Sequence, residues 1–527
     1  MKIITKFFEI YYRFQYFYHN LKIHKNVNKK KQNIILIELN NYYPNHILYS
    51  YLSNILSEKF SAEIIGYDSI RSTSIIVKLK RFVKNILPLN NVHIYKSFGL
   101  KNVLNLNKYN SSININNIKA KHNAILKNIS KKKILNLKLD GIYIGDLLYD
   151  DFLRTYYVGS IDFENEIFSK HLYEFIKTFY LWRYYLKKNN VKSIILSHSV
   201  YECGLALRVA QNQNIPVYLA DNFRLVRFNK NKKFVLDNNL FKEIKSSLTL
   251  EEKNKLIKTA KKELKKHFST KNDDFVEFSR MIIKTKKFKT FLKNRKNFFS
   301  KKKLNIFVAC HCFYDAAHVY GKFFYDDFVD WLENLGKISE KTNYQWFLKK
   351  HPHSLNQKLT DKLLGNFAKK YPKFQIIPED IDNRSLKKYI DLVLTVHGSV
   401  SYEMAYLNKN VILASRPDHH KAFKFCIYPK NRKEYEKFLL NPKKFKKNKI
   451  SRKDIFEFYY LTYICLFDFG GFTSAQKILK NNYFTPAIYN YWIKEFNIEK
   501  HLFLKNIVKN YVSNKKTLLW DKNKLLN

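Results

Sequence analysis

Short apolar runs alternate with helical stretches along this chain, and this alternation constrains its fold more than any other feature. In the first half the runs are NIILIEL (33–39), AEIIGYD (62–68), KSIILSHS (192–199) and IPVYLAD (215–221), and the stretch 46–60 is predicted to be helical. Strands that alternate with helices build a parallel, doubly wound sheet. The first half is therefore predicted to contain a parallel sheet covered by helices.

A second series of the same kind follows in the other half. Its runs are LNIFVACH (304–311), YQWFLKKHP (344–352), FQIIPED (374–380), DLVLTVHGS (391–399) and NVILAS (410–415). The predicted fold class is therefore α/β, with two Rossmann-like domains that face each other across a cleft, the architecture called GT-B. An open α/β sheet binds its ligand beyond the carboxyl ends of its strands, so the functional residues are sought there.

Changes in composition divide the chain into five predicted segments. They are a basic aromatic helix (1–32), an amino-terminal Rossmann-like domain (33–228), a lysine-rich helical interdomain segment (229–303), a carboxyl-terminal Rossmann-like domain (304–430) and a helical extension (431–527).

The chain is strongly basic. It has 96 Lys and Arg residues against 44 Asp and Glu, a net charge of +52, and its 46% hydrophobic content excludes disorder throughout its length. Such a charge favours an acidic partner such as nucleic acid, anionic lipid or a phosphorylated substrate. The abundance of Lys, Asn, Ile, Tyr and Phe also fits AT-rich codon usage, so the charge alone does not choose a function.

Five cysteines form no Cys-x-x-Cys pair, which argues against a disulfide framework and a structural zinc site and favours a reducing compartment. Cys310, His311 and Cys312 are adjacent, and neighbouring residues of a strand point to opposite faces. No metal and no cofactor are therefore expected. The sequence shows no convincing signal peptide and no apolar run of membrane-spanning length, which predicts a soluble or surface-bound protein.

The segment VHGSVSYEMAYLNKNVI carries the strongest local signal. A buried strand delivers His397, Gly398 and Ser399, and a helix is predicted to begin within a few residues. A glycine lets the backbone approach a ligand closely, and the amides at a helix start favour phosphate or carboxylate. These three residues are therefore predicted to bind the phosphates of a nucleotide.

The first turn of the same helix supplies further candidates. Ser399 and Ser401 are able to cap the helix and to donate to phosphate oxygens, and Glu403 is placed to accept from a sugar or ribose hydroxyl. The alternative is an ordinary helix start in which Glu403 complements the helix dipole.

A second candidate element is FLKKHPHS, in which a strand ends in two lysines. Lys350 and His351 follow the strand, and Pro352 turns the chain out of the sheet. Cationic and imidazole donors at a strand end suit nucleotide phosphates, although a polar turn is the alternative. This element lies one strand-helix-strand module before His397. We therefore predict that it belongs to the same site as His397.

Candidates for a catalytic base lie in ACHCFYDAAHVYGK. Asp315, close to His311 and His318, is a possible general base toward an acceptor hydroxyl, and His311 is the other candidate. A histidine that simply ends a strand is the alternative for His311.

The acceptor side is predicted in the first half. The stretch DGIYIGDLLYDDFLR contains Asp146 and Asp150, and His198 lies at the end of a strand. These residues are expected to bind an acceptor sugar, or else to support the interface between the domains.

The segment VHGSVSYEMAYLNKNVI resembles the nucleotide-binding segment of GT-B glycosyltransferases that build bacterial surface carbohydrates. FLKKHPHS resembles the His-Pro element of capsule polysaccharide biosynthesis proteins, which include Kdo transferases and CMP-sialic-acid-using sialyltransferases. In the latter, a His-Pro motif and a later Ser motif hold the donor nucleotide, and His351-Pro352 and Ser399 match by type and order. The resemblance covers about 304–420 well, but the paired acidic motif that supplies the sialyltransferase base is not found.

These patterns together favour a metal-independent glycosyltransferase that moves a sugar from a nucleotide-sugar to a surface glycan or lipid-linked acceptor. A polyol-phosphate transferase of the teichoic-acid type is an alternative within the same fold. A basic nucleic-acid-binding protein and a non-catalytic assembly partner are alternatives from other classes. No nucleic-acid-binding module is recognised, so no specific nucleic acid is expected.

The expected location is cytoplasmic, peripheral on the inner face of the cell membrane. Residues 1–32 interleave aromatic residues with lysines, which suits an anionic membrane surface and equally a helix packed on the next domain. The basic stretches 229–303 and 443–453 are further candidates for membrane contact.

Overall fold

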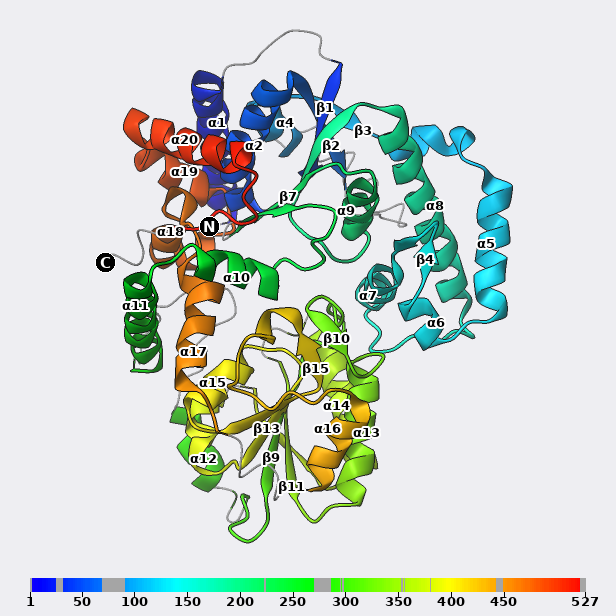
Figure 1. The fold of residues 1–527 in the computed structure, drawn as a ribbon, viewed down its shortest axis with the longest axis vertical. Helices are drawn as coiled ribbons and strands as arrows, with labels where there is room; N and C mark the ends of the chain where they lie inside the picture. The colour runs from blue at the N-terminus through cyan, green and yellow to red at the C-terminus, as the bar shows by residue number, and fades with distance from the viewer. Residues whose placement is uncertain are drawn as a thin grey trace.

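The computed structural model consists of two lobes, each built around a parallel sheet (Figure 1). The described residues are 2–24, 32–68, 91–221, 224–269, 286–293, 295, 298–351, 354, 356–379, 381–441 and 449–521. The predicted α/β class is confirmed. Among the described residues, no helix has both the length and the apolar character needed to cross a membrane.

The upper lobe in Figure 1 contains a six-stranded sheet in the order β3-β2-β1-β6-β7-β8. Its strands are β1 (Asn33–Leu39), β2 (Ala62–Asp68), β3 (Leu100–Leu104), β6 (Val191–Leu196), β7 (Val217–Ala220) and β8 (Leu225–Phe228). β1 pairs in parallel with β2 and β6, whereas the edge strand β8 is antiparallel to β7. The predicted strands 33–39 and 62–68 are confirmed with their bounds.

Helices cover both faces of this sheet. Alternate residues of β1 therefore pack into two different cores, one on each face. Ile35 and Ile37 share a core with α2, whereas Ile34 and Leu36 share one with α8 and α9. The helices are α1 (Lys2–Ile23), α2 (Tyr43–Phe60), α4 (Asn91–Lys96), α5 (Ile115–Lys127), α6 (Lys131–Leu135), α7 (Gly145–Tyr156), α8 (Glu166–Lys188) and α9 (Cys203–Asn212), and β4 (Lys138–Leu139) pairs with β5 (Ile142–Tyr143). α2 begins before the predicted residue 46, with a proline in its first turn, where the missing amide costs nothing.

The lower lobe contains a five-stranded, fully parallel sheet in the order β12-β11-β9-β13-β14. Its strands are β9 (Asn305–Ala309), β11 (Gln345–Lys349), β12 (Phe374–Ile377), β13 (Leu392–Thr395) and β14 (Asn410–Leu413), and its helices are α13 (Phe328–Glu340), α14 (Gln357–Lys370) and α15 (Val400–Tyr406). A short antiparallel pair, β10 (Gly321–Phe323) and β15 (Ser415–Pro417), adjoins the sheet. Gly321 is required there, because its φ is +141° and a Cβ would lie 2.6 Å from the Arg416 carbonyl oxygen.

The remaining helices lie in the segments 229–303 and 431–527. They are α10 (Asn238–Ser246), α11 (Leu250–Ser269), α12 (Lys286–Lys293), α16 (Arg432–Leu440), α17 (Arg452–Tyr459), α18 (Phe472–Leu479), α19 (Ala487–Lys494) and α20 (Ile498–Ser513). α16 packs on α13 in the lower lobe, whereas α20 packs on α2 in the upper lobe. The end of the chain also joins the upper sheet, because the Leu519 amide donates to the Leu225 carbonyl oxygen at 2.9 Å. The described residues of the segment 431–527 therefore belong in part to each lobe.

Candidate functional site

The two lobes meet at residues that follow the carboxyl ends of their sheets. Tyr201, after β6, donates its hydroxyl to the Asp315 carboxylate, after β9. The Ala316 amide donates to the Tyr201 oxygen at 3.2 Å. Burial and the Asp315 carboxylate both raise the pKa of Tyr201, so this hydroxyl keeps its proton and remains a donor. The predicted base candidate is thus held at the junction by a hydrogen bond from the other lobe.

A second contact joins Asp150 of α7 to the segment after β9. The Asp150 carboxylate lies 2.7 Å from His318 Nδ1 and accepts from the backbone amides of Ala317 and His318 at 3.3 and 3.2 Å. Burial opposes the charged imidazolium, but the carboxylate outweighs it and raises the pKa of His318. Asp150 therefore contacts both lobes, and its predicted role toward an acceptor stays a prediction.

Asp327 makes a third contact and is fully buried. Its Oδ2 accepts from the Tyr149 hydroxyl at 2.6 Å and the Ser160 hydroxyl at 2.7 Å, and Lys131 Nζ lies 3.0 Å away. Its Oδ1 accepts from the Asp330 amide at the start of α13. This one carboxylate therefore caps a helix of the lower lobe and also binds three side chains of the upper lobe. These contacts hold the two sheets in their relative orientation.

His311 lies at the carboxyl edge of the lower sheet, between β9 and β13. Its Nε2 accepts from the backbone amides of Val396 and His397, both at 3.3 Å, and lies 3.2 Å from Thr395 Oγ1. Burial, followed by the charges of His397 and His351, lowers the pKa of His311 well below its usual value. His311 is therefore neutral with its proton on Nδ1, and the lone pair of Nε2 is engaged by the backbone.

His397 continues this edge. Its ring centroid lies 4.6 Å from that of His311 and 4.8 Å from that of Tyr320. Tyr320 lies in turn 5.3 Å from His419. Burial lowers the pKa of both His397 and His419 to about 3, and His419 contributes to the shift of His397. The lower edge thus presents neutral imidazoles, which donate or accept hydrogen bonds without carrying charge.

Gly398 and Ser399 adjoin His397, as predicted from the sequence. A Cβ on Gly398 would meet His311 Cε1 at 3.4 Å, which is ordinary contact, so packing within the protein does not require glycine here. Ser399 is the residue before α15, but its side chain makes no capping hydrogen bond. Ser401 is buried, and among the described residues its hydroxyl has no hydrogen-bond partner. Neither serine caps the helix, and Glu403 lies half-buried in its first turn.

Lys350 is placed differently from the prediction that it faces a phosphate. Its Nζ lies 2.7 Å from Asp361 and 2.9 Å from Glu379. Burial would lower its pKa, but the hydrogen bonds to these carboxylates raise it. Binding a phosphate would require Lys350 to exchange partners. His351 lies close enough to affect His311, whereas Pro352 lies outside the described residues.

The carboxyl edge of the upper sheet carries a buried acid and a histidine. Glu38 of β1 is 2% exposed and accepts from the backbone amide of Ser197, the residue after β6. The Ser197 hydroxyl lies 2.7 Å from His198 Nδ1. The His198 ring lies 5.7 Å from that of Tyr42, which follows β1. His198 therefore has the strand-end position predicted for it, with Tyr42 beside it.

Asp146 is bound by a neighbouring helix. Its Oδ2 accepts from Arg208 of α9 at 2.8 Å, and its Oδ1 accepts from the Leu147 amide. This ion pair is buried and joins two helices of one lobe. The Asp146 carboxylate also helps to raise the pKa of His318 at the junction.

Several residues of the junction were missed in the sequence. Arg224, after β7, binds Asp221 through two nitrogens at 3.2 and 3.0 Å. Asp221 raises the pKa of Arg224, and Tyr320 of the lower lobe contributes to the same shift. Two residues could have been found from the sequence. Glu38 is a single acid inside an apolar run, and His419 belongs to a pair of histidines after the strand at 410–415.

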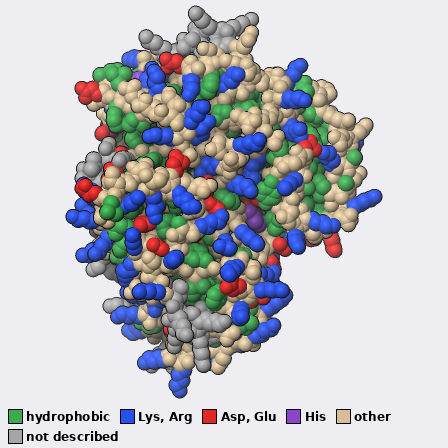
Figure 2. Space-filling view, viewed as in Figure 1, with side chains coloured by type: hydrophobic (Ala, Val, Ile, Leu, Met, Phe, Trp, Pro, Cys, Tyr) green, Lys and Arg blue, Asp and Glu red, His purple; other side chains and the backbone are tan. Residues whose placement is uncertain are grey.

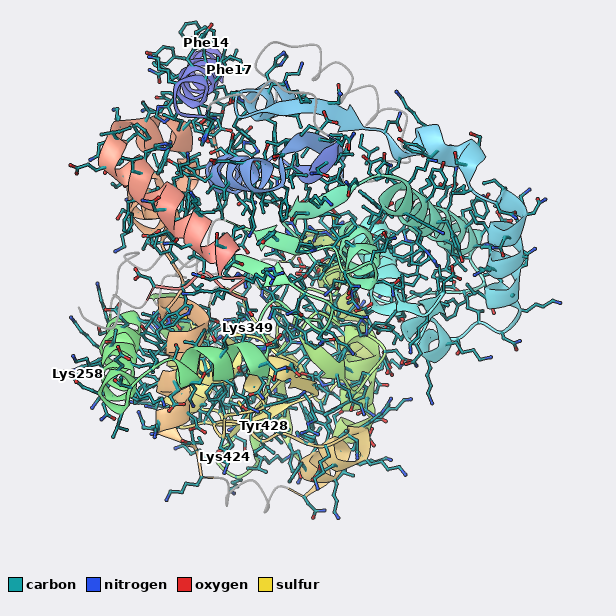
Figure 3. The ribbon with its side chains drawn as sticks, turned by 45° about the horizontal axis from the view of Figure 1, so that its top comes forward. Phe14, Phe17, Lys258, Lys349, Lys424 and Tyr428 are labelled. Atoms are coloured by element: carbon teal, nitrogen blue, oxygen red, sulfur yellow. The ribbon has the colours of Figure 1, made fainter. Side chains whose placement is uncertain are left out.

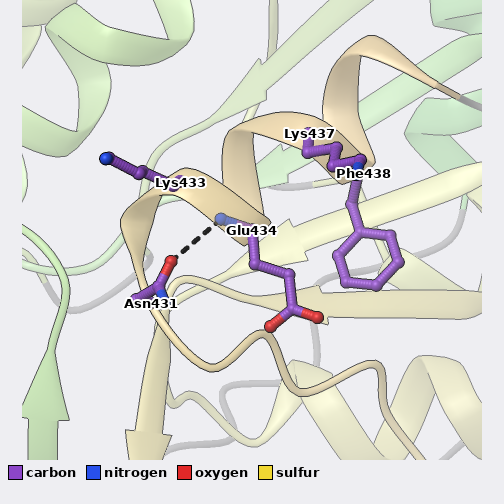
Figure 4. A pocket seen from close by; sticks show the side chains of 5 residues that line it. All are labelled: Asn431, Lys433, Glu434, Lys437 and Phe438. Carbon is purple, nitrogen blue, oxygen red and sulfur yellow. Dashed lines mark hydrogen bonds between the residues drawn. The ribbon is translucent and has the colours of Figure 1, made fainter.

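Metal binding and pocket geometry add no second site. Within the described ranges, no group of three or more His, Cys, Asp or Glu residues is placed to hold a metal ion. A surface pocket lies at the start of α16 (Figure 4) and is lined by Asn431, Lys433, Glu434, Lys437 and Phe438. The dashed line in Figure 4 marks a helix cap, in which the Asn431 side chain accepts a hydrogen bond from the Glu434 amide at 3.0 Å.

Comparisons with known proteins reach only structural likeness. No family profile and no curated protein matches the sequence. Among solved structures, the UDP-GlcNAc 2-epimerase of Neisseria meningitidis bound to UDP-GlcNAc is similar over 81% of this chain and 97% of its own, with 10% identity and a TM-score of 0.25. KpsC of Thermosulfurimonas dismutans, a beta Kdo 2,4 transferase, is similar over 51% of this chain and 80% of its own, with 12% identity and a TM-score of 0.31. MurG of Acinetobacter baumannii is similar over 82% of this chain and 95% of its own, with 10% identity and a TM-score of 0.24. Likeness at this level does not carry an activity from one chain to another.

Proposed function

We propose that this chain is a glycosyltransferase that moves a sugar from a nucleotide-sugar donor to a surface glycan or a lipid-linked acceptor, with CMP-linked donors as the first candidates. One observation carries the proposal. The carboxyl ends of two parallel sheets meet, and Asp315 lies at the contact between them, hydrogen-bonded to Tyr201. Ligands of open α/β sheets bind beyond these ends, so a donor on one edge and an acceptor on the other would meet at Asp315.

The donor is assigned to the lower edge. Gly398 has no packing reason to be glycine, and Ser399 leaves its hydroxyl out of the helix cap. Beside them, His397 is neutral and able to donate a hydrogen bond to a phosphate oxygen. Arg224 of the upper lobe, which pairs with Asp221, is close enough for its charge to interact with Tyr320 of this edge. Together these groups favour a nucleotide phosphate over an uncharged ligand.

Asp315 is the better of the two base candidates. The Nε2 lone pair of His311 is engaged by two backbone amides, so it is not available to accept a proton from an acceptor. The hydrogen bonds to Asp315 both reach Oδ1, and in the described part of the chain none reaches Oδ2. Asp315 is also exposed, so Oδ2 is accessible to a hydroxyl group.

The acceptor is assigned to the upper edge, near His198 and Tyr42. Their rings lie 5.7 Å apart, and His198 is half-buried. A sugar hydroxyl would find a hydrogen-bonding imidazole there and an aromatic face against which a ring packs.

Transfer activity and product analysis test the proposal. The full chain is incubated with radiolabelled nucleotide-sugars and a lipid-linked or oligosaccharide acceptor, with and without EDTA. A glycosidic product that forms equally with EDTA is expected. A phosphodiester product supports the polyol-phosphate alternative instead, and activity that requires an added divalent cation contradicts metal independence. Tight, salt-sensitive nucleic-acid binding with no transfer contradicts the proposal as a whole.

A further inference from the structure

One face of α1 exposes a continuous stripe of aromatic and aliphatic side chains. The stripe consists of Phe7, Ile10, Tyr11, Phe14, Tyr18 and Leu21, which are between 41% and 69% exposed. Steps of three and four residues bring them to one side of the helix, within about 100° of its circumference. Soluble proteins rarely leave such a surface uncovered, and one of this kind marks an interaction site.

The opposite face of α1 is fixed to the body of the protein. The Tyr16 ring stacks on that of Tyr489 in α19 at 4.1 Å, and Asn20 Nδ2 donates to the Ser97 hydroxyl at 2.9 Å. Both Tyr16 and Asn20 are fully buried. The rotation of the helix is therefore set, and the stripe faces away from the protein, as the position of Phe14 at the outer edge in Figure 3 shows.

The beginning of α20 adds apolar side chains at the same end of the molecule. Ile498, Leu502 and Phe503 are between 52% and 63% exposed. The ring of His501 lies 6.2 Å from that of His24, the residue that follows α1. The end of α1 and the beginning of α20 therefore lie close together.

We propose that α1 and the beginning of α20 form a surface that binds the headgroup region of an anionic lipid bilayer. α1 carries four basic residues and one acidic residue, and Lys22 and Lys505 are exposed near the point where the two helices meet. Tyrosine and phenylalanine suit the boundary between headgroups and acyl chains, and lysines attract anionic lipid. A second copy of the chain is a poorer occupant, because two molecules of charge +52 repel each other.

Charge alone does not single out this surface. α11 is also a basic helix, and Figure 3 shows Lys258 at its outer side. Among the described residues of α11, the exposed large apolar side chain is Leu250, at the first position of the helix. α11 therefore has the lysines of a membrane-binding helix without the apolar stripe.

The surface is linked to the carboxyl edge of the upper sheet. Arg13 of α1 donates to the hydroxyl of Tyr43 at 2.5 Å, and Tyr43 is the first residue of α2 after β1. Tyr42, the residue before it, contacts His198. If the proposed function holds, a bilayer bound by α1 lies on the side of the lobe that receives the acceptor. Membrane binding itself does not depend on that function.

Vesicle sedimentation of the full chain tests the proposal. Vesicles of phosphatidylcholine with and without phosphatidylglycerol are compared at low and high salt, for wild type, for a Phe14→Ser/Tyr18→Ser variant and for a Leu250→Ser control. Wild type and control should bind the anionic vesicles, and the double variant should bind at least about tenfold more weakly, because each lost aromatic side chain removes buried apolar area. Thermal unfolding should be the same for all three, since the changed side chains are exposed.

Three results would overturn the proposal. They are equal sedimentation of the double variant and wild type, no sedimentation of wild type with anionic vesicles at low salt, and a wild-type dimer by light scattering that the double variant converts to monomer. The last result would assign the stripe to a second copy. Transfer to a water-soluble acceptor should be the same in the double variant, so failure here is distinguishable from failure of the transferase proposal.

Discussion

The carboxyl edges of the two sheets differ in how their polar groups are used. On the lower edge, His311 and His397 are neutral and lie beside a glycine that internal packing does not require. On the upper edge, the buried Glu38 carboxylate accepts a hydrogen bond from the Ser197 amide, and the His198 ring lies beside that of Tyr42. The lower edge therefore presents neutral hydrogen-bonding groups, whereas the upper edge presents an aromatic and imidazole surface. This asymmetry is what a transferase with separate donor and acceptor sites requires.

Asp315→Asn should have the largest effect, because Asp315 lies where the two edges meet. Asparagine keeps an oxygen for the Tyr201 hydroxyl but cannot take a proton, so kcat should fall by about 10²- to 10⁴-fold. Nucleotide binding, measured by calorimetry, should be unchanged. The matched control is Glu166→Gln, which removes an exposed carboxylate at the start of α8. If Asp315→Asn retains full kcat, the base lies elsewhere and the two edges do not converge on this residue.

His198→Ala should affect the upper edge alone. Loss of the imidazole should raise the KM for the acceptor by roughly tenfold, the value of one hydrogen bond to a bound substrate, while the Kd for nucleotide stays the same. Steady-state kinetics at varied acceptor concentration measure the effect. An increase in nucleotide Kd instead of acceptor KM would reverse the assignment of the two edges.

The lower edge should make the protein sensitive to acid. His397 and His419 have folded pKa values of about 3, below their unfolded values, so their stabilising contribution is present above about pH 6.5 and is lost as the pH falls toward 3. Each should cost about 1 kcal/mol of unfolding free energy per pH unit in that range. Urea unfolding at several pH values measures the slope. His397→Gln should reduce this slope, and equal slopes in wild type and His397→Gln would contradict neutral burial.

The sequence predicted much of the sheet framework, because parallel strands buried on both faces are written as continuous apolar runs. The runs 33–39 and 62–68 became β1 and β2 with the same bounds. His311 and His397 were each predicted to follow a strand of the second sheet, but their proximity depends on the pairing of β9 with β13, which the apolar runs do not specify.

Contacts between distant segments were not predictable in the same way. The ion pairs of Lys350 with Asp361 and Glu379 depend on how α14 and the loop after β12 pack, which no local pattern specifies. The pairing of Tyr201 with Asp315 depends on the orientation of the two lobes. The return of α20 to the upper lobe was likewise missed, because an amphipathic helix does not record which surface it will cover.

Binding of free nucleotides tests the central claim most directly. Thermal unfolding is measured with CMP, CDP, UDP and GDP for wild type, Gly398→Ala and Gly365→Ala, a helix position where a Cβ meets nothing within 4 Å. At about 100 times its Kd, a ligand adds roughly 2.7 kcal/mol of stability. At least one nucleotide should raise the Tm of wild type and of Gly365→Ala, and Gly398→Ala should lose this shift while unfolding like wild type without ligand. If no nucleotide shifts wild type, or if Gly398→Ala shifts as wild type does, the lower edge is not the donor site.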